Sequence, residues 1–476
     1  MVLRFYNTLT RQKEEFISIE KDVVKIYSCG PTVYSYAHIG NLRAALFIDI
    51  LKRVLRYFNF KVLDVVNITD VGHLVSDEDD GEDKMLKASK KEKKDPYEIA
   101  RFYENAYLDD LKNLNIVKPK YMPRATDNIE EQKLIIEELE NKGYTYVTED
   151  GVYFDVSKFN DYGKLSGQSL DQKKAGARIQ VDTHKKNPQD FALWKFLTGD
   201  NENHIMKWDS KWGLGFPGWH IECSAMSKKY LGLEFDIHTG GIDHVPVHHE
   251  NEIAQNECSR AVERINFWMH NAHLMVYNDK MSKSKGNYYI LNDLTKKGYS
   301  PLAFRELCLR THYRKTINFT FEALDAAQSS YKSINDFYSK IKALKPSEVT
   351  EDQFKDLYYK TLDKFENALK DDINTPLALS AVHEFMNQYN KKVHLSENDI
   401  KTAIQLIERV DIVLGLLEKQ EEIPQSVMDL AYRRQKARSL KKFDEADKLR
   451  EMIKEQGYDI KDSRNTKEGF IIEKLN

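Results

Sequence analysis

The sequence predicts an α/β protein in which a parallel-sheet domain carries an inserted module and is followed by a mostly helical half. An apolar extended run at 23–27 precedes a loop and then a helical pattern. A second apolar run at 62–68 follows at the distance of a parallel βαβ unit. Long amphipathic segments dominate from 300 to 417, so the second half is predicted to be helical.

The first strand and helix flank a loop that breaks the pattern. Residues 23–27 are β-branched or aromatic, and the loop Cys29-Gly30-Pro31-Thr32 ends the strand. One face of the following helix carries apolar residues: Leu42, Ala45, Leu46 and Ile50. The second run ends on Asn67-Ile68-Thr69-Asp70, at the mouth of the predicted sheet, where ligands bind in such folds.

Changes of pattern divide the chain. A helix at 129–142 and short strands at 144–156 indicate an insertion into the sheet domain, and the βα pattern resumes near 212. Ser300-Pro301 begins a helix, and Ile423-Pro424 marks a later boundary. We predict a sheet domain in two halves, at 1–123 and 209–290, with an insertion between them at 124–208. A helical domain at 291–420 and a C-terminal module at 421–476 follow.

Composition excludes several protein classes. Apolar residues make up 41% and charged residues 31%, which is the balance of a globular chain and not of a disordered one. No apolar run approaches a bilayer span or a signal peptide, so we expect a cytoplasmic protein that does not enter membranes. Four scattered cysteines do not suggest a disulfide framework, which leaves thiols for metal binding.

Charge gives little evidence of nucleic acid. The net charge is only -3, so any RNA contact must come from a local patch. The best patch is a basic helix after 424, although such a face is more often merely solvated. Its basic residues are Arg433, Arg434, Lys436, Arg438, Lys441 and Lys442. The acidic run at 76–83 is interpreted as a solvated loop without chemistry.

Two short motifs suggest phosphate chemistry. His38-Ile39-Gly40-Asn41 lies where the helix begins, so backbone N–H groups and the helix dipole favour a polyphosphate there. Lys280-Met281-Ser282-Lys283-Ser284 lies far downstream, and its lysines could neutralise charge on departing pyrophosphate. Taken alone, the first motif is more often a structural histidine at a helix start, and the second is more often a solvated basic loop. Together they are a much stronger indication.

In this order and separation, HIGN and KMSKS resemble the two signatures of class I aminoacyl-tRNA synthetases. The resemblance implies ATP-dependent chemistry, with His38, Asn41, Lys280 and Lys283 as catalytic residues. It also implies that Gly40, together with His38 and Lys283, binds ATP with its Mg²⁺. Asn41 departs from the family's usual histidine, and an amide can donate a hydrogen bond but carries no charge.

Further segments resemble the cysteinyl-tRNA synthetases: 216–226, 248–255 and Cys29 before its Gly-Pro turn. The resemblance implies one Zn²⁺ per chain, held by Cys29, Cys223, His248 and Glu252. His248 and Glu252 are four residues apart, which places them on one helix face, but no CxxC pair is present. Without the resemblance, these thiols would be interpreted as core residues.

Zinc would explain how cysteine is selected, because a soft metal binds a thiolate far better than the hydroxyl of serine. Pocket shape alone separates such similar side chains only about 10 to 200-fold. The resemblance also implies a cysteine pocket of Trp219, His238 and Thr69, although each could merely pack locally. Thr239 stands where the family usually has glycine. Four further residues are interpreted as structural: His249, His273, Cys258 and Cys308.

The resemblance covers most of the chain and implies a class I Rossmann-like catalytic domain, a stem-contact and helical-bundle domain, and an anticodon-binding module. The expected reaction forms cysteinyl adenylate from L-cysteine and ATP, and then transfers cysteine to the 2′ oxygen of tRNA(Cys). A monomer is expected. Two alternatives stay open: a ligase that joins cysteine to an amino sugar, as in mycothiol synthesis, and a catalytically silent zinc- and RNA-binding protein.

Overall fold

The computed structural model describes residues 2–71, 88, 94–168, 185–202, 204–282, 285–347, 352–392, 394–418, 423–463 and 469–475. Two compact units make up the chain. The first comprises Met1–Tyr331, Tyr359–Phe385 and Ile412–Gly415, and the second comprises Lys332–Tyr358, Met386–Asp411 and Leu416–Asn476. No helix in the described part of the chain has the length and apolar character needed to cross a membrane.

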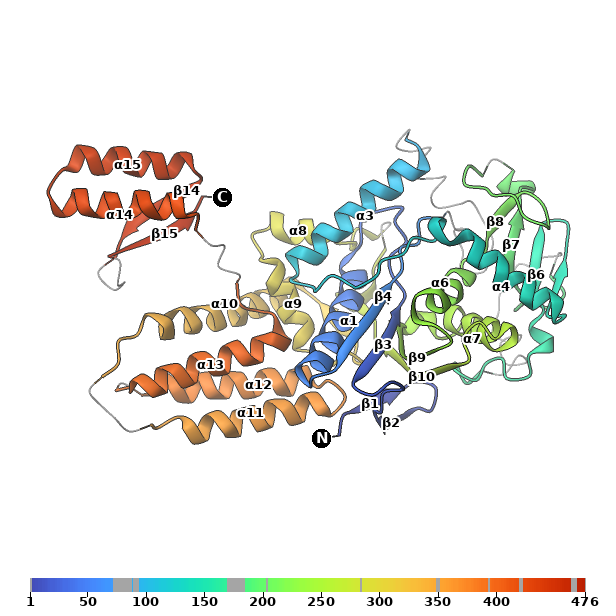
Figure 1. The fold of residues 1–476 in the computed structure, drawn as a ribbon, viewed down its shortest axis with the longest axis horizontal. Helices are drawn as coiled ribbons and strands as arrows, with labels where there is room; N and C mark the ends of the chain where they lie inside the picture. Colours follow the sequence, from blue (N-terminus) through green and yellow to red (C-terminus); the bar gives the residue numbers. More distant parts are fainter. Residues whose placement is uncertain are drawn as a thin grey trace. The chain divides into compact units, whose positions relative to one another are not determined.

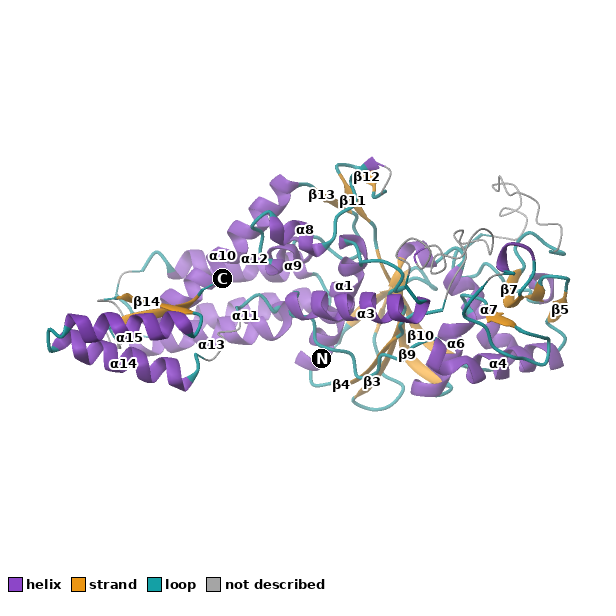
Figure 2. Ribbon diagram, turned by 90° about the horizontal axis from the view of Figure 1, so that it is seen from above, coloured by secondary structure: helices purple, strands orange, loops and turns teal. Residues whose placement is uncertain are grey.

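A four-stranded parallel sheet forms the centre of the first unit (Figures 1 and 2). Its strands, in spatial order, are β10 (Arg264–Asn271), β9 (Glu234–Gly241), β3 (Val23–Ser28) and β4 (Lys61–Val66). Helix α1 (Ile39–Tyr57) connects β3 to β4, as the alternation of apolar runs predicted. The predicted α/β class with a parallel sheet is therefore confirmed. Because the strands are parallel, their carboxyl ends meet at one edge of the sheet.

An α/β insertion separates β4 from β9. Helix α3 (Pro96–Asn113) comes first, and α4 (Ile129–Asn141) later covers an antiparallel sheet. The strands of this sheet are β5 (Thr145–Val147), β6 (Gly151–Phe154), β7 (Phe191–Phe196) and β8 (Gly215–Pro217). Single-turn 3₁₀ segments occur at η1 (Thr126–Asn128), η2 (Val156–Lys158), η3 (Gly199–Asn201) and η4 (Ile242–His244).

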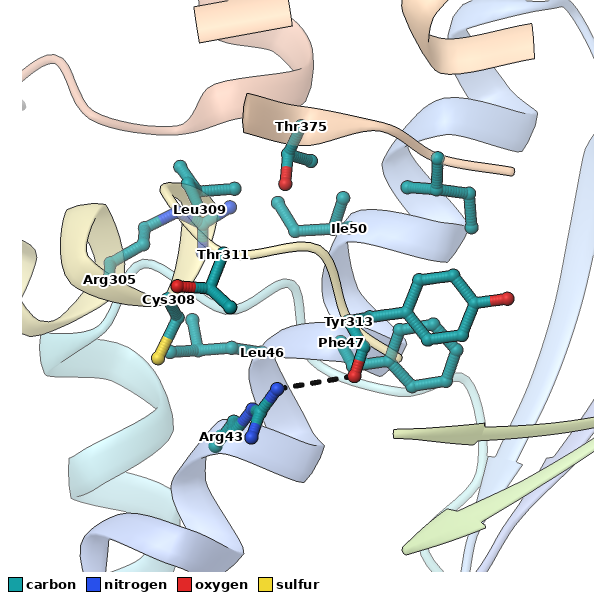
Figure 3. Close-up of a pocket in the computed structure, with 11 residues that line it drawn as sticks. Arg43, Leu46, Phe47, Ile50, Arg305, Cys308, Leu309, Thr311, Tyr313 and Thr375 are labelled. Carbon is teal, nitrogen blue, oxygen red and sulfur yellow. Dashed lines mark hydrogen bonds between the residues drawn. The ribbon is translucent and has the colours of Figure 1, made fainter. Parts of the chain in front are cut away.

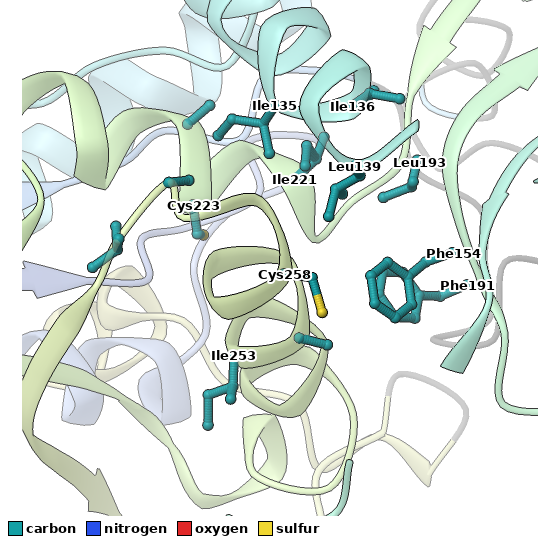
Figure 4. Packing of buried hydrophobic residues seen from close by; sticks show 14 of the residues in the cluster. Ile135, Ile136, Leu139, Phe154, Phe191, Leu193, Ile221, Cys223, Ile253 and Cys258 are labelled. Atoms are coloured by element: carbon teal, nitrogen blue, oxygen red, sulfur yellow. The ribbon is translucent and has the colours of Figure 1, made fainter. Parts of the chain in front are cut away.

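One hydrophobic core joins this insertion to the helices that carry the site. Ile135, Ile136 and Leu139 of α4 pack with Phe154 and Phe191 of the antiparallel sheet (Figure 4). The same cluster includes residues of α6 (Ile221–Leu231) and α7 (His248–Ser259), which precede and follow β9. The insertion therefore stabilises both helices through buried apolar contacts.

Shorter elements complete the first unit. Its N-terminal hairpin is β1 (Arg4–Asn7) and β2 (Gln12–Glu15), and a small sheet contains β12 (Asp279–Lys280), β11 (Leu274–Val276) and β13 (Ile317–Phe319). Helices α8 (Leu291–Lys296) and α9 (Pro301–Leu309) follow β12. Ser300 caps α9 by accepting a hydrogen bond from the Leu302 amide at 3.2 Å, and Pro301 begins the helix, as predicted.

The remaining chain is largely helical, as the amphipathic segments predicted. Four long helices are α10 (Phe321–Ala343), α11 (Lys355–Lys370), α12 (Thr375–Tyr389) and α13 (Glu397–Leu414). The second unit ends with α14 (Gln425–Ser439), α15 (Phe443–Glu455), β14 (Tyr458–Asp462) and β15 (Phe470–Lys474). These last elements bury their own small core around Val427 and Ile453.

The basic helix predicted after 424 is α14, but its charge is partly neutralised. Arg434 is only 4% exposed and contacts Asp462 at 2.9 Å, and Arg438 contacts the same carboxylate at 3.0 Å. Asp462 is the last residue of β14. The solvated basic face is therefore smaller than the sequence suggested.

Candidate active site and metal centre

The four residues predicted to hold a metal lie together at the carboxyl edge of the parallel sheet. Cys29 directly follows β3, Cys223 lies in the first turn of α6, and both His248 and Glu252 lie on α7. Their donor atoms all lie within 4.8 Å of one another. Cys223, His248 and Glu252 are buried, whereas Cys29 is partly exposed.

The distances among these donor atoms suit a tetrahedral metal site. The two Sγ atoms are 3.9 Å apart, Cys223 Sγ is 3.5 Å from His248 Nε2, and that nitrogen is 3.0 Å from Glu252 Oε1. Zinc bonds of about 2.0 to 2.3 Å in a tetrahedron require ligand separations of about 3.3 to 3.8 Å. Two thiols, one imidazole and one carboxylate are also donors that zinc accepts. The residues therefore fit a zinc ion.

Neighbouring side chains orient these donors. The Nδ1 atom of His248 lies 2.9 Å from Nδ1 of His220, so its Nε2 faces the thiols. The ring of Trp219 stacks on His248, with centroids 4.5 Å apart. On the other side, His238 Nε2 contacts Glu252 Oε2 at 2.8 Å. Trp219 and His238, predicted to bind cysteine, therefore both contact candidate metal ligands.

His249, which the sequence analysis interpreted as structural, also belongs to this cluster. Its Nε2 lies 3.2 Å from Cys29 Sγ, and its Nδ1 lies 2.7 Å from Nε2 of His270. His270 Nδ1 in turn contacts the Thr8 hydroxyl at 2.8 Å. Together with Cys29, His238 and Glu252, His249 forms a second possible ligand set. The adjacent pair His248-His249 was the only sequence signal for this role.

Burial and charge shift the ionisation of the cluster. Burial, the neighbouring Cys223 thiol and the Glu252 carboxylate raise the pKa of Cys29 well above its usual value. Burial lowers the pKa of His248, but Glu252 and Cys223 outweigh it and raise that pKa to about 10. A Cys29 thiolate would thus place further negative charge beside Glu252 in one buried place, and a cation held there would favour that ionised form.

Glu250 fastens the insertion to the helix that bears His248 and Glu252. Its buried carboxylate accepts hydrogen bonds from the amides of Gly163 and Ser166, each at 2.9 Å. The next residue of α7, Asn251, accepts a hydrogen bond from the Tyr162 hydroxyl at 2.5 Å. The loop at 162–166 therefore holds α7 by charge-assisted hydrogen bonds as well as by packing.

Thr69 lies near this cluster, three residues after the end of β4, and is 2% exposed. Its hydroxyl donates to Glu222 Oε2 at 2.8 Å and accepts from Nδ2 of the Asn67 side chain at 3.1 Å. Asn67 also accepts from the Gly30 amide at 2.8 Å, and a Cβ at Gly30 would lie only 1.7 Å from the Asn67 carbonyl oxygen. Thr69 thus fixes the loop after Cys29.

Thr239, which departs from the family pattern, has a local partner. Its hydroxyl donates to the Ser28 hydroxyl at 2.7 Å, and both residues are completely buried. The two lie opposite each other in the parallel pair β3 and β9. A polar side chain is therefore accommodated at this position because the neighbouring strand supplies a partner.

His38 caps the helix that begins at the first motif. Its Nδ1 accepts hydrogen bonds from the amides of Gly40 and Asn41 at 3.0 and 3.2 Å, and Asn41 Oδ1 accepts from the His38 amide at 3.1 Å. This pattern assigns the proton of the neutral ring to Nε2, which makes that atom a donor. A Cβ at Gly40 would lie 2.8 Å from Cε1 and 2.9 Å from Nδ1 of the His38 ring, so the capping histidine itself favours glycine at this position.

The second motif lies beside the first. The amide of Ile39 donates to the Tyr289 carbonyl at 3.0 Å, which joins the start of α1 to the segment after the motif. Asn287 folds the loop by accepting from the Ser282 amide at 2.8 Å. Lys280 is exposed at the end of β12. Lys283, and with it Ser284, lies outside the described residues, as does the acidic run at 76–83.

A buried arginine anchors α1 to the segments that follow β10 and precede β13. Arg43 donates to the carbonyl oxygen of Tyr313 at 3.2 Å (Figure 3). It also donates to the carbonyl oxygens of His273 and Lys315. The cavity drawn there has a volume of only about 30 Å³, which is too small for a nucleotide. The role of Arg43 is therefore structural, because it fixes the helix that begins at His38 against the residues near 273.

One larger cavity, of about 490 Å³, connects the metal cluster with both motifs. Cys29 lies at its wall, as do His38 and Lys280. Asn41, Gly40 and Tyr107 of α3 also line it, together with Asp243, His244 and His273. Burial lowers the pKa of His244 to about 4, so this imidazole is neutral at pH 7. Trp219, His238 and Thr69 are not part of the cavity's lining.

A family model described as "tRNA synthetases class I (C) catalytic domain" matches residues 15–329, and a DALR domain model matches residues 364–418. The chain is 41% identical to a cysteine–tRNA ligase of Treponema denticola, covering 97% of this chain and 98% of that relative. It belongs to the cysteine–tRNA ligase family. A relative from Burkholderia lata, cysteine–tRNA ligase 1, is 42% identical over 97% of this chain and 96% of its own.

Solved structures show the same fold in related enzymes. A methionyl-tRNA synthetase of Mycobacterium tuberculosis with methionyl-adenylate aligns with a TM-score of 0.58 at 15% identity, covering 83% of this chain and 90% of that one. The LeuRS of Agrobacterium radiobacter K84, in a ternary complex with tRNA and LeuAMS, gives 0.60 at 11% identity, covering 83% and 84%. The predicted class I fold and family are thus confirmed, and the chain is an enzyme, a ligase of the class I aminoacyl-tRNA synthetases.

Proposed function

We propose that this cysteine–tRNA ligase activates L-cysteine with Mg-ATP in the cavity of about 490 Å³, and selects cysteine over serine through zinc at its wall. The observation that carries the proposal is that one cavity borders Cys29 as well as His38 and Lys280. A thiol recognised at one end and a polyphosphate bound at the other would therefore share one space.

The zinc ligands we propose are Cys29, Cys223, His248 and Glu252, because their spacing fits a tetrahedron. Zinc held there would supply a soft Lewis acid that prefers the thiolate of cysteine to the hydroxyl of serine. Trp219, His238 and Thr69 were predicted to bind cysteine, and we propose that they do so indirectly, by orienting His248, Glu252 and the loop after Cys29.

In the first step, the carboxylate of cysteine attacks the α-phosphate of ATP in line, so cysteinyl adenylate and pyrophosphate form. His38 donates from Nε2 to the phosphates, and Lys280 and Lys283 neutralise the charge that moves onto pyrophosphate. Gly40 leaves the helix start open to the nucleotide, and Asn41 contributes its side-chain amide. No protein nucleophile is needed.

In the second step, the terminal ribose 2′-hydroxyl of tRNA(Cys) attacks the activated carbonyl and releases AMP. We propose that the C-terminal module at 421–476 reads the anticodon through the exposed part of α14 and its neighbours, and that the protein acts as a cytoplasmic monomer. We also keep as part of the proposal the domain boundaries that the sequence predicts, after residues 123, 208, 290 and 420.

Cysteine-dependent ATP–pyrophosphate exchange, followed by charging of unfractionated tRNA, tests the proposal. Exchange with cysteine but not with serine, together with charging, is the expected result. Exchange without charging would favour the alternative small-molecule ligase. A protein that binds zinc and RNA but shows no exchange would contradict the proposed activity.

A further inference from the structure

Two exposed aromatic side chains lie side by side where the first motif meets α3. Tyr36 is 42% exposed and Phe102 is 46% exposed, and their ring centroids are 6.0 Å apart. Both rings pack edge-on against Tyr103, at 5.0 and 5.1 Å, and Tyr103 is only 9% exposed. Tyr103 thus supports two large rings that remain accessible to solvent. Two neighbouring exposed rings form an apolar patch of the kind that marks a binding surface.

The pair does not itself line the reaction cavity, but it belongs to the two segments that do, the first motif and α3. Tyr107, one helical turn after Tyr103 on the same face of α3, lines the cavity, and so does His38, two residues after Tyr36. A single strand that reached the cavity between α3 and the first motif would therefore pass close to Tyr36 and Phe102. The ammonium group of Lys94 lies 5.1 Å from the centre of the Phe102 ring, which adds a positive charge beside the pair.

We propose that Tyr36 and Phe102 form a stacking platform for the unpaired 3′-terminal bases of the tRNA. Single-stranded nucleic acid is recognised by aromatic rings beside cationic side chains, because every base offers a π face. The transfer step requires the tRNA end to reach the cavity, and the platform would hold its unpaired bases beside two segments that line it. This inference rests on the proposed function, since it names where the nucleic acid substrate of that reaction is held.

The test compares binding of full-length tRNA(Cys) with binding of the same tRNA lacking its last three nucleotides. The wild-type enzyme is expected to bind the full-length tRNA more tightly. Phe102→Ala, and likewise Tyr36→Ala, should weaken binding of full-length tRNA by about 5- to 150-fold, which is the range of one lost stack, and leave the truncated tRNA unaffected. Tyr36→Phe should retain tight binding because it keeps the ring.

A matched control is Tyr121→Ala, which removes another exposed ring, 38% accessible with Lys120 above it, that is not part of the pair. It should not alter the difference between the two tRNAs. If Phe102→Ala weakens binding of both tRNAs equally, or of neither, the proposal of a stacking platform is wrong. A wild-type protein that charges no tRNA would instead overturn the proposed function, so the two failures are distinguishable.

Discussion

The Sγ atom of Cys29 lies 3.9 Å from the Sγ atom of Cys223, although 194 residues separate them in sequence. One thiol follows a strand of the parallel sheet and the other begins a helix after the insertion. The zinc proposal depends on this convergence, because neither cysteine has a nearby partner in sequence that would form a metal motif by itself.

Cys223→Ser is expected to reduce zinc from one ion per chain to a small fraction, because a hydroxyl is a poor zinc ligand. Elemental analysis of the purified variant checks the metal content, and pyrophosphate exchange checks whether the preference for cysteine over serine falls at least tenfold. Cys308→Ser is the control, because Cys308 is not part of the donor cluster. Full zinc content in Cys223→Ser would contradict its role as a ligand.

Lys280→Ala is expected to lower the rate of pyrophosphate exchange by about 10² to 10³-fold, the usual loss for one donor that stabilises transition-state charge. Cysteine binding, measured by calorimetry, should change little. Lys285→Ala is the matched control, since Lys285 is also exposed and pairs with Asp279 at 3.1 Å. Equal losses in exchange and in cysteine affinity would argue against a phosphate role for Lys280.

Asn41→Asp should separate helix capping from nucleotide binding. The carboxylate keeps an acceptor for the His38 amide and adds negative charge to the first turn of α1, so thermal stability should be unchanged or slightly higher. Because Asn41 lines the cavity, the same charge should repel ATP and raise its KM about tenfold. An unchanged KM would show that residue 41 does not face the phosphates.

Glu306→Gln should stabilise the protein at pH 8. Burial raises the pKa of Glu306 to about 7, and the Ser330 hydroxyl and Arg310 only partly offset this. Between about pH 4.5 and 7, Glu306 is therefore protonated in the folded state but ionised in the unfolded state. Its contribution to the free energy of unfolding falls as the pH rises through that window. The stabilisation by glutamine should reach up to about 3 kcal/mol above pH 7 and vanish near pH 4.

Urea unfolding at both pH values measures this difference. A similar effect of Glu306→Gln at pH 4 and pH 8 would show that packing, rather than ionisation, accounts for it.

The sequence predicted those parts of the site that depend on local pattern and family motif. Cys29 at the end of β3 follows from an extended run broken by Gly-Pro, and the shared face of His248 and Glu252 follows from helical spacing. That Cys29 and Cys223 approach each other could come only from the resemblance, because it depends on how sheet and helices assemble.

Other contacts had no sequence signal. Glu250 binds backbone amides of a loop about 85 residues away, and a backbone N–H is present at nearly every residue, so no pattern marks it as a partner. The same holds for Arg434, whose pairing with Asp462 depends on where β14 lies against α14. Sequence therefore indicates charge, but not which charges are neutralised.

The most direct test of the central claim is X-ray absorption at the zinc edge of the purified enzyme, without and with cysteine. The account predicts two sulfur ligands in the free enzyme, from Cys29 and Cys223, and three after cysteine is added, with no change after serine is added. A sulfur count that does not rise with cysteine would contradict selection of the substrate through its thiol.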